Sequence, residues 1–303
     1  MTDAVDRALD ILRHGGAVAI PTETVYGLAA DASNESAVRR IFAIKQRPAD
    51  HPLIVHIASS TALDHWAASV SAEAALLAED CWPGPLTLLL PRGPSVLDVV
   101  TGGRDTVGLR VPAHPLTLEL LARFGGGLAA PSANRFGQVS PTTAEHVRDD
   151  LGDDVDFVLD GGPCPIGVES TIVDCSTSPP QILRPGGIPD EAIAALLDGA
   201  PAPASGAQRA SGMLASHYAP KARVEVFEST QQAQQRAARL EDVGQRVELL
   251  DASADLVDAA RNLYERLRDA DRRGCDTVVA VLPAPTGLGH AIRDRLIKAA
   301  GLG

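Results

Sequence analysis

The chain has 303 residues, of which 45% are hydrophobic, so it has enough apolar content to form one large or two ordinary domains. Its formal net charge of -12, from 39 acidic and 27 basic residues, argues against a protein that grips nucleic-acid phosphates over a broad surface. Aromatic residues make up only 3% of the chain, which also disfavours a platform for stacking single-stranded bases.

The cysteines and the N-terminus exclude further classes. Cys81, Cys164, Cys175 and Cys275 are far apart and show neither metal-ligand nor redox spacing, so we expect them to act as small apolar residues. The first residues lack the basic and apolar regions of a signal peptide, and no segment approaches the roughly 20 apolar residues of a membrane span. We therefore expect a cytoplasmic protein.

The first two thirds of the chain predict a mixed α/β domain. Apolar runs predict strands over residues 17–20, 53–57, 86–90, 107–111, 128–130, 155–159 and 171–174. Helical spacing predicts helices over residues 4–12, 36–45, 116–124, 142–151 and 189–197. Asn34 is the expected cap of the second helix, and Thr142 with Glu145 forms a capping-box pattern at the fourth. Many loops then fall at strand ends.

The composition changes after residue 199, where Pro, Ala, Gly and Ser dominate as in an extended linker. We predict a catalytic domain over 1–199, a linker over 200–221 and a small domain over 222–303. In the last part, strands expected at 223–227, 247–250 and 277–282 alternate with helices at 231–240, 256–270 and 291–299. This pattern is typical of a small, parallel, Rossmann-like sheet, although no G-x-G-x-x-G turn marks a dinucleotide site.

Basic residues beside turns indicate an anion site. Lys45 and Arg47 lie two apart where a predicted helix runs into Pro48, and can direct two cations at one anion. Arg110 ends an apolar run and Arg184 precedes a Pro-Gly turn. Any one of these residues is more often a solvated surface charge, but four in such settings favour binding of an anion such as a nucleotide. No Walker-type phosphate loop is present.

Small polar residues follow the same pattern. Ser132 and Asn134 come directly after a predicted strand, where open α/β sheets place ligand-binding groups. A turn that satisfies only local backbone groups is an equally good interpretation, and the same holds for Thr22 and for Ser170. The segment from His217 to Pro220 follows the linker without an obvious packing role, which favours a flap over a bound molecule.

In their order along the chain, these motifs resemble the threonylcarbamoyl-AMP synthases in their two-domain form, with a YrdC-like N-terminal domain. The matching segments are Pro21-Thr22-Glu23-Thr24-Val25-Tyr26-Gly27-Leu28, Lys45-Gln46-Arg47, Ser132-Ala133-Asn134, Ser140-Pro141-Thr142, Glu169–Asp174, Leu183-Arg184-Pro185-Gly186, Ser211-Gly212-Met213 and His217-Tyr218-Ala219-Pro220-Lys221. The resemblance spans nearly the whole chain. It implies a nucleotidyltransferase with a twisted mixed sheet, a concave pocket and a small Rossmann-like C-terminal domain.

The resemblance further implies a reaction. L-Threonine, bicarbonate and ATP give threonylcarbamoyl-adenylate and pyrophosphate, for the threonylcarbamoyladenosine modification of tRNA. Mg²⁺ is expected to accompany ATP without a dedicated cluster of protein ligands, and the product is expected to pass to a tRNA threonylcarbamoyltransferase. We expect no stable binding of nucleic acid and no membrane partner. The C-terminal domain is interpreted by analogy as a regulatory or flap-positioning unit.

Site residues are implied position by position. Lys45 and Arg47 would contact carbamate and phosphate oxygens as the catalytic cations. The expected ATP contacts are Lys45, Arg47, Thr106, Asn134, Ser140, Thr142, Arg184 and Tyr218. The expected threonine contacts are Thr22, His51, Arg110, Ser132 and Ser170. The alternative is an RNA-binding or ribosome-assembly module on the same fold without synthase activity, which the acidic charge and scarce aromatic residues disfavour.

Overall fold

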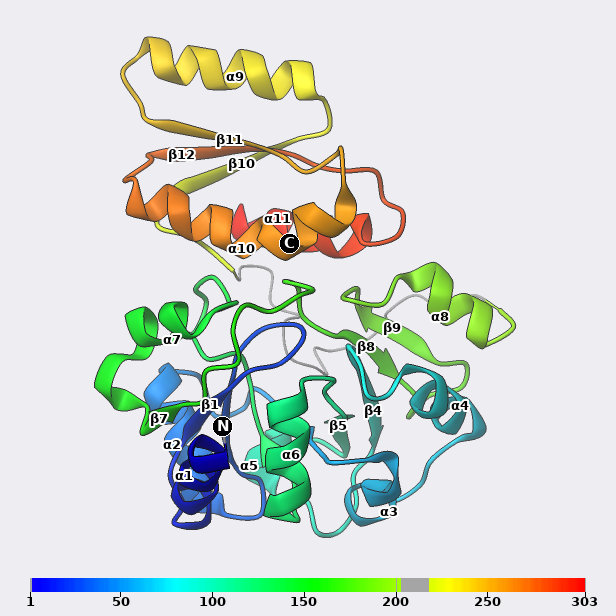
Figure 1. Ribbon diagram of the computed structural model, residues 1–303. Helices are drawn as coiled ribbons and strands as arrows, with labels where there is room; N and C mark the ends of the chain where they lie inside the picture. Colours follow the sequence, from blue (N-terminus) through cyan, green and yellow to red (C-terminus); the bar gives the residue numbers. More distant parts are fainter. Residues whose placement is uncertain (1, 200, 203–217, 303) are drawn as a thin grey trace.

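The computed structural model describes residues 2–199, 201–202 and 218–302. This part of the chain contains two sheets, a nine-stranded sheet of order β7-β1-β2-β6-β3-β5-β4-β8-β9 and a three-stranded sheet of order β10-β12-β11. The large sheet mixes parallel and antiparallel pairs, whereas both pairs of the small sheet are parallel. The predicted fold class, a mixed α/β unit followed by a small Rossmann-like unit, is confirmed (Figure 1).

The large unit contains nine strands and eight α-helices among the described residues. Its strands are β1 (Val18–Ile20), β2 (Gly27–Asp31), β3 (Ile54–His56), β4 (Leu86–Pro91), β5 (Thr106–Arg110), β6 (Leu128–Ala129), β7 (Phe157–Val158), β8 (Thr171–Asp174) and β9 (Gln181–Arg184). Its helices are α1 (Thr2–Arg13), α2 (Glu35–Lys45), α3 (Leu63–Trp66), α4 (Ala72–Cys81), α5 (Asp98–Thr101), α6 (Pro115–Phe124), α7 (Ala144–Leu151) and α8 (Asp190–Leu196), with 3₁₀ turns at Ser60–Ala62 and Gly152–Asp154.

The small unit covers both faces of its sheet. Its strands are β10 (Arg223–Phe227), β11 (Val247–Asp251) and β12 (Thr277–Val281), and its helices are α9 (Thr230–Asp242), α10 (Leu256–Arg272) and α11 (Gly289–Ala299). Val279 and Val281 pack with α9, while Val278 and Ala280 pack with α10 and α11. Helices α10 and α11 lie on the side facing the large unit, and α9 lies on the far side (Figure 1).

Two helix starts test the sequence interpretation. Asn34 is the N-cap of α2, as predicted, and its side chain accepts a hydrogen bond from the Ala37 amide. The capping box predicted at Thr142 is wrong, because α7 begins one residue later than that motif requires. Thr143 is the N-cap and its hydroxyl accepts from the His146 amide. The Thr142 amide instead donates to the His146 ring nitrogen Nδ1.

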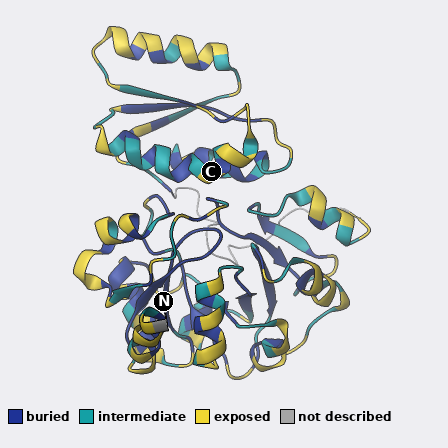
Figure 2. Ribbon diagram, viewed as in Figure 1, coloured by how far each residue is buried: buried dark blue, intermediate teal, exposed yellow. Residues whose placement is uncertain are grey.

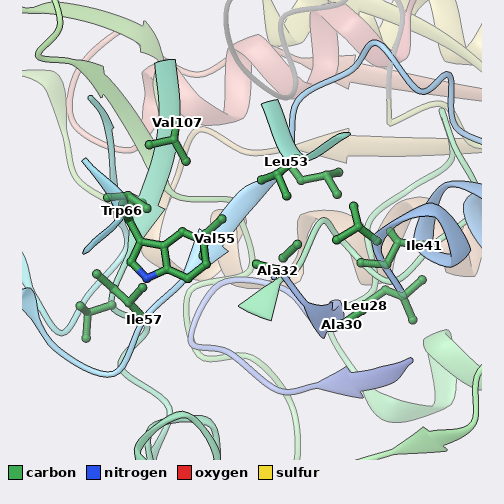
Figure 3. Packing of buried hydrophobic residues seen from close by; sticks show 14 of the residues in the cluster. Leu28, Ala30, Ala32, Ile41, Leu53, Val55, Ile57, Trp66 and Val107 are labelled. Atoms are coloured by element: carbon green, nitrogen blue, oxygen red, sulfur yellow. The ribbon is translucent and has the colours of Figure 1, made fainter. Parts of the chain in front are cut away.

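The main core lies beneath one face of the large sheet, because alternate strand residues point to the same side. Val55 and Val107 pack there with Ile41 of α2 and Trp66 of α3 (Figure 3). At Gly127 a Cβ atom would lie 2.4 Å from the Trp66 ring, so only glycine lets the chain entering β6 approach this core. The helices expose their outer faces while the strands are largely buried (Figure 2).

The opposite face of the large sheet is covered by different elements at its two ends. At the β1, β2 and β6 end it is covered by α1 and α6, which pack through Leu9, Leu12 and Leu120 among others. Farther along, the described apolar residues of that face form a small cluster of strand side chains: Leu89, Ile172 and Leu183 with Ile54. The alternation of strand side chains puts His56 on the same face of β3 as Ile54. This part of the sheet positions the polar groups described next.

The described part of the chain has no helix that is both long and apolar enough to cross a membrane.

Candidate active site

A pocket lies where several strand ends and loops of the large unit meet. It is lined from the loop after β1, from the end of α2, from β3, β5 and β9, from the loop after β6, and from the residues just before β8. The lining residues are Thr22, Thr24, Val25, Gly27, Arg47, Ile54, His56, Arg110, Ala130, Pro131, Ser132, Glu169, Ser170, Arg184 and Tyr218. The pocket thus brings together seven residues predicted from the sequence: Thr22, Arg47, Arg110, Ser132, Ser170, Arg184 and Tyr218.

Three buried arginines give the pocket its charge. Arg110 forms an ion pair with Glu23 at 2.7 Å and also donates to the Thr24 hydroxyl at 3.0 Å. Arg184 donates to the Ser170 carbonyl and hydroxyl, and Arg47 donates to the Pro52 carbonyl. Burial lowers the pKa of Arg47 to about 10, which still leaves it protonated at neutral pH. Guanidinium groups held in this way match the geometry of carboxylate and phosphate oxygens.

Hydroxyl groups complete the polar lining. The Thr22 hydroxyl donates to the Val25 carbonyl at 2.6 Å and lies 2.8 Å from the Thr24 hydroxyl. The Ser170 hydroxyl lies 2.8 Å from that of Thr87. Among the described residues, no histidine or carboxylate base is hydrogen-bonded to either hydroxyl, as one would be in an activated nucleophile. The lining is therefore suited to binding and orienting a polar ligand.

Sequence reasoning chose His51 and missed His56. His51 does not line the pocket; its ring makes an edge contact with the Phe136 ring at 5.2 Å. His56 lines the pocket and pairs in register with Arg110 on the neighbouring strand. Burial, together with nearby Arg110, lowers the pKa of His56 to about 3, so its imidazole is neutral at physiological pH. The signal was available, because His56 interrupts an apolar strand.

Lys45, predicted as a catalytic cation, holds a loop. Its side chain is 1% exposed, and its Nζ donates to the carbonyls of Ser132 and Asn134 at 2.5 and 2.6 Å. Burial, with Arg47 nearby, lowers the pKa of Lys45 well below its ordinary value. The Asn134 amide nitrogen donates to the carbonyls of Arg135 and Gln138. Neither Lys45 nor Asn134 lines the pocket, although both fix the loop that carries Ser132.

The other predicted nucleotide contacts, Thr106, Ser140 and Thr142, are not among the described residues that line the pocket. Thr106 begins β5, and alternation puts it on the same face as Arg110, four residues along the strand. The buried Ser140 hydroxyl donates to Glu169 at 2.6 Å. Thr142 is buried beside His146. Of the predicted flap, His217 lies outside the described residues, as does the segment 211–213, whereas Tyr218 is described.

Tyr218 occupies one wall of the pocket in an unusual backbone conformation. Its φ is 64°, in the left-handed region that bulky side chains rarely adopt, and its side chain is buried. Its ring stacks on Tyr264 of α10 at 5.8 Å, and the guanidinium of Arg295 of α11 lies 5.1 Å from the ring centre. Behind this wall Glu169 meets Tyr264 and Arg295. The sequence analysis noted Glu169 only as part of a motif at the start of a strand, and it did not consider Tyr264 or Arg295.

Comparisons with known proteins agree with this geometry. A family model described as "Telomere recombination" matches residues 10–186, and one described as "Threonylcarbamoyl-AMP synthase, C-terminal domain" matches residues 188–301. The chain is 43% identical to the threonylcarbamoyl-AMP synthase of Pyrococcus abyssi, over 97% of this chain and 93% of that protein. It is 41% identical to the Bacillus subtilis protein of the same name, over 98% of this chain and 93% of that protein.

A solved structure extends the similarity to three dimensions. The crystal structure of Pyrococcus abyssi Sua5 complexed with L-threonine superimposes with a TM-score of 0.93 at 40% identity, covering 98% of this chain and 94% of that one. The similarity thus spans both sheets. The chain belongs to the threonylcarbamoyl-AMP synthase family in its two-domain form and is an enzyme of the nucleotidyltransferase type.

Proposed function

We propose that this enzyme makes L-threonylcarbamoyl-adenylate and pyrophosphate from L-threonine, bicarbonate and ATP, and that the product serves the threonylcarbamoyladenosine modification of tRNA. The observation that carries the proposal is the pocket in which Arg47, Arg110 and Arg184 meet the hydroxyls of Thr22, Ser132 and Ser170. The crystallised relative bound to L-threonine supports threonine as the amino acid.

The reaction suits a site that binds and orients its substrates. The neutral threonine amine forms a bond to the bicarbonate carbon with loss of water, which gives a carbamate anion. A carbamate oxygen then attacks the α-phosphorus of ATP, the bond to the β-phosphate oxygen breaks, and pyrophosphate leaves. Three anionic groups must be held close together, and buried cations with N–H and O–H donors lower the cost of doing so.

We assign each substrate to its own part of the proposed site. We place the threonine carboxylate on Arg110, with Thr22, Ser132 and Ser170 as its neighbours, and assign neutral His56 rather than His51 to this end. The nucleotide is assigned to the remaining predicted residues: Arg47, Thr106, Asn134, Ser140, Thr142, Arg184 and Tyr218. Arg47 is proposed to meet the phosphate undergoing attack. Lys45 is proposed to act by fixing the 132–134 loop through its two carbonyl bonds.

Mg²⁺ belongs to the proposal as the partner of the triphosphate. Among the described residues, Glu169 is the carboxylate that lines the pocket, and it is already engaged by Ser140, Tyr264 and Arg295. A protein-held metal does not fit this arrangement, so no step is routed through one. Transfer of the product to a separate tRNA threonylcarbamoyltransferase is likewise proposed on the basis of the family alone.

Pyrophosphate release tests the proposal. The purified protein should release pyrophosphate from ATP only when both bicarbonate and L-threonine are present, with serine and allothreonine as matched controls. A folded protein that releases none, and instead binds tRNA tightly with a strong salt dependence, would favour the RNA-binding alternative and refute the synthase proposal.

A further inference from the structure

Arg295, on α11 of the small unit, reaches two segments that form the pocket. Its side chain is 0% exposed, and its Nε donates to the Glu169 carboxylate at 2.8 Å. Its Nη1 donates to the Pro185 carbonyl at 3.0 Å. Glu169 directly precedes Ser170, and Pro185 directly follows Arg184, so one guanidinium ties together the two chain segments that carry these lining residues.

Tyr264, on α10, supports the same carboxylate. Its hydroxyl donates to Glu169 at 2.7 Å, on the carboxylate oxygen that Arg295 also contacts. The other carboxylate oxygen accepts from Ser140 of the large unit. Both Tyr264 and Arg295 also touch the ring of Tyr218. The small unit therefore makes buried contacts with three parts of the pocket wall.

The contacted segments are packed too tightly to move independently. Arg184 donates to the Ser170 carbonyl through both Nε and Nη2. The backbone at Gly186 lies so close to residues 169–171 that a Cβ atom would be 2.3 Å from the Thr171 amide nitrogen. A displacement of Glu169 or Pro185 must therefore shift Ser170 and Arg184 as well, and small shifts of binding groups are costly to catalysis.

We propose that Arg295, together with Tyr264, is a positioning residue of the active site: by holding Glu169 and Pro185, it sets Ser170 and Arg184 for substrate binding. The small unit is thereby a structural part of the site. This inference rests on the proposed function, because it takes Ser170 as a threonine contact and Arg184 as a nucleotide contact. Neither Arg295 nor Tyr264 lines the pocket, so both act through the residues they hold.

A second, partly buried ion pair between the units allows the positioning of the site to be distinguished from contact between the units alone. Arg268 of α10 pairs with Asp150 of α7 at 2.5 Å, and both side chains are 11% exposed. Neither lines the pocket. Removing Arg295 leaves buried Glu169, and removing Arg268 leaves partly buried Asp150, without the arginine paired with it, and either change weakens the contact between the units. Of these two arginines, Arg295 contacts the segments that carry Ser170 and Arg184, whereas Arg268 donates to the Val139 carbonyl.

The test compares Arg295→Met with Arg268→Met, and adds Arg295→Lys and Tyr264→Phe. Steady-state kinetics give KM for L-threonine, KM for ATP and kcat, and thermal unfolding gives the stability of each variant. We expect Arg295→Met to raise KM for threonine and lower kcat by about tenfold or more each, since a misplaced binding group costs this much. Arg295→Lys should recover part of the lost activity. Arg268→Met should keep KM for L-threonine within about twofold of the wild-type value, although its loss of stability should be similar to that of Arg295→Met.

The following results would overturn the inference or the proposed function. Equal kinetic changes in Arg295→Met and Arg268→Met would overturn the inference in favour of simple docking. If Arg295→Met does not fold, wild-type KM values in both Arg295→Lys and Tyr264→Phe would overturn it as well. If the wild-type protein shows no threonine-dependent turnover, the proposed function fails. Hydrogen exchange then tests positioning alone, because amides of residues 168–172 and 184–188 should exchange faster in Arg295→Met but not in Arg268→Met.

Discussion

The two sheets differ in what covers them, and the difference locates the site. The small parallel sheet has helices on both faces, as is usual for parallel sheets, so its strands offer no open surface. The large mixed sheet is covered on one face by helices, but around β3, β5, β4 and β8 the described residues of its second face form a small apolar cluster beside polar side chains. The pocket forms on that face, and the small unit contributes through α10 and α11.

Within the pocket, Arg47 is expected to matter for turnover far more than for stability. Arg47→Ala should lower kcat by about 10²–10³-fold, because a fixed donor aimed at developing charge is removed from a buried site. The thermal midpoint should change little by comparison. Arg40→Ala is the matched control, since Arg40 lies on α2 and pairs with Asp156 at the surface. Wild-type kcat in Arg47→Ala would remove Arg47 from the site.

Lys45 is expected to differ from Arg47, because its loss should reduce stability and turnover together. Lys45→Met leaves the buried carbonyls of Ser132 and Asn134 without their donor, at about 1–3 kcal/mol for each unsatisfied group. Urea unfolding measures the loss of stability, and kinetics measure the effect on the loop carrying Ser132. A variant of unchanged stability that nevertheless loses turnover would instead mean that Lys45 contacts the substrate directly.

Glu169 links the two units in a pH-dependent way. Burial alone raises its pKa, but Arg295 and Arg184 outweigh burial and lower the pKa to about 2. The ionised carboxylate therefore contributes stability above its unfolded pKa of about 4.5, and this contribution is lost as the pH falls toward 2. Glu169→Gln should be less stable than the wild type at pH 7, and the difference should shrink between about pH 4.5 and pH 2. A constant difference across that range contradicts this assignment.

The smallest effect is expected on the far side of the small unit. Arg236, on α9, pairs with Glu225 within that unit and away from the pocket. Arg236→Ala should keep turnover within about twofold of the wild type, since a partly exposed pair away from the site contributes little. A large loss of turnover in this variant would mean that the whole small unit, not only α10 and α11, governs the site.

Local patterns predicted most of the fold. The caps and apolar spacing of α2 and the alternation of strands in the small unit are features of short segments, and these were predicted well. Helix α4 was missed because its apolar residues are not confined to one side, as exposed Leu76 illustrates. Strand β2 was missed because its alanines show no alternation.

The site was predictable only in part, because local sequence patterns do not show which distant residues come into contact. Arg110, Ser132 and Ser170 sit at strand ends, where position along the chain already indicates a role. The contact between Glu169 and Arg295 joins residues 126 positions apart and depends on how two folded units pack. Lys45 was predicted to face a ligand because the sequence gives its charge but not the two carbonyls that its side chain reaches.

The most direct test of the central claim follows the bicarbonate carbon. The enzyme is incubated with ¹³C-labelled bicarbonate, ATP and L-threonine, and the products are analysed by mass spectrometry. We predict a labelled adduct that contains both threonine and AMP, formed together with pyrophosphate and absent when threonine is omitted. Pyrophosphate release without label in a threonine–AMP adduct would contradict the proposed synthesis of threonylcarbamoyl-adenylate.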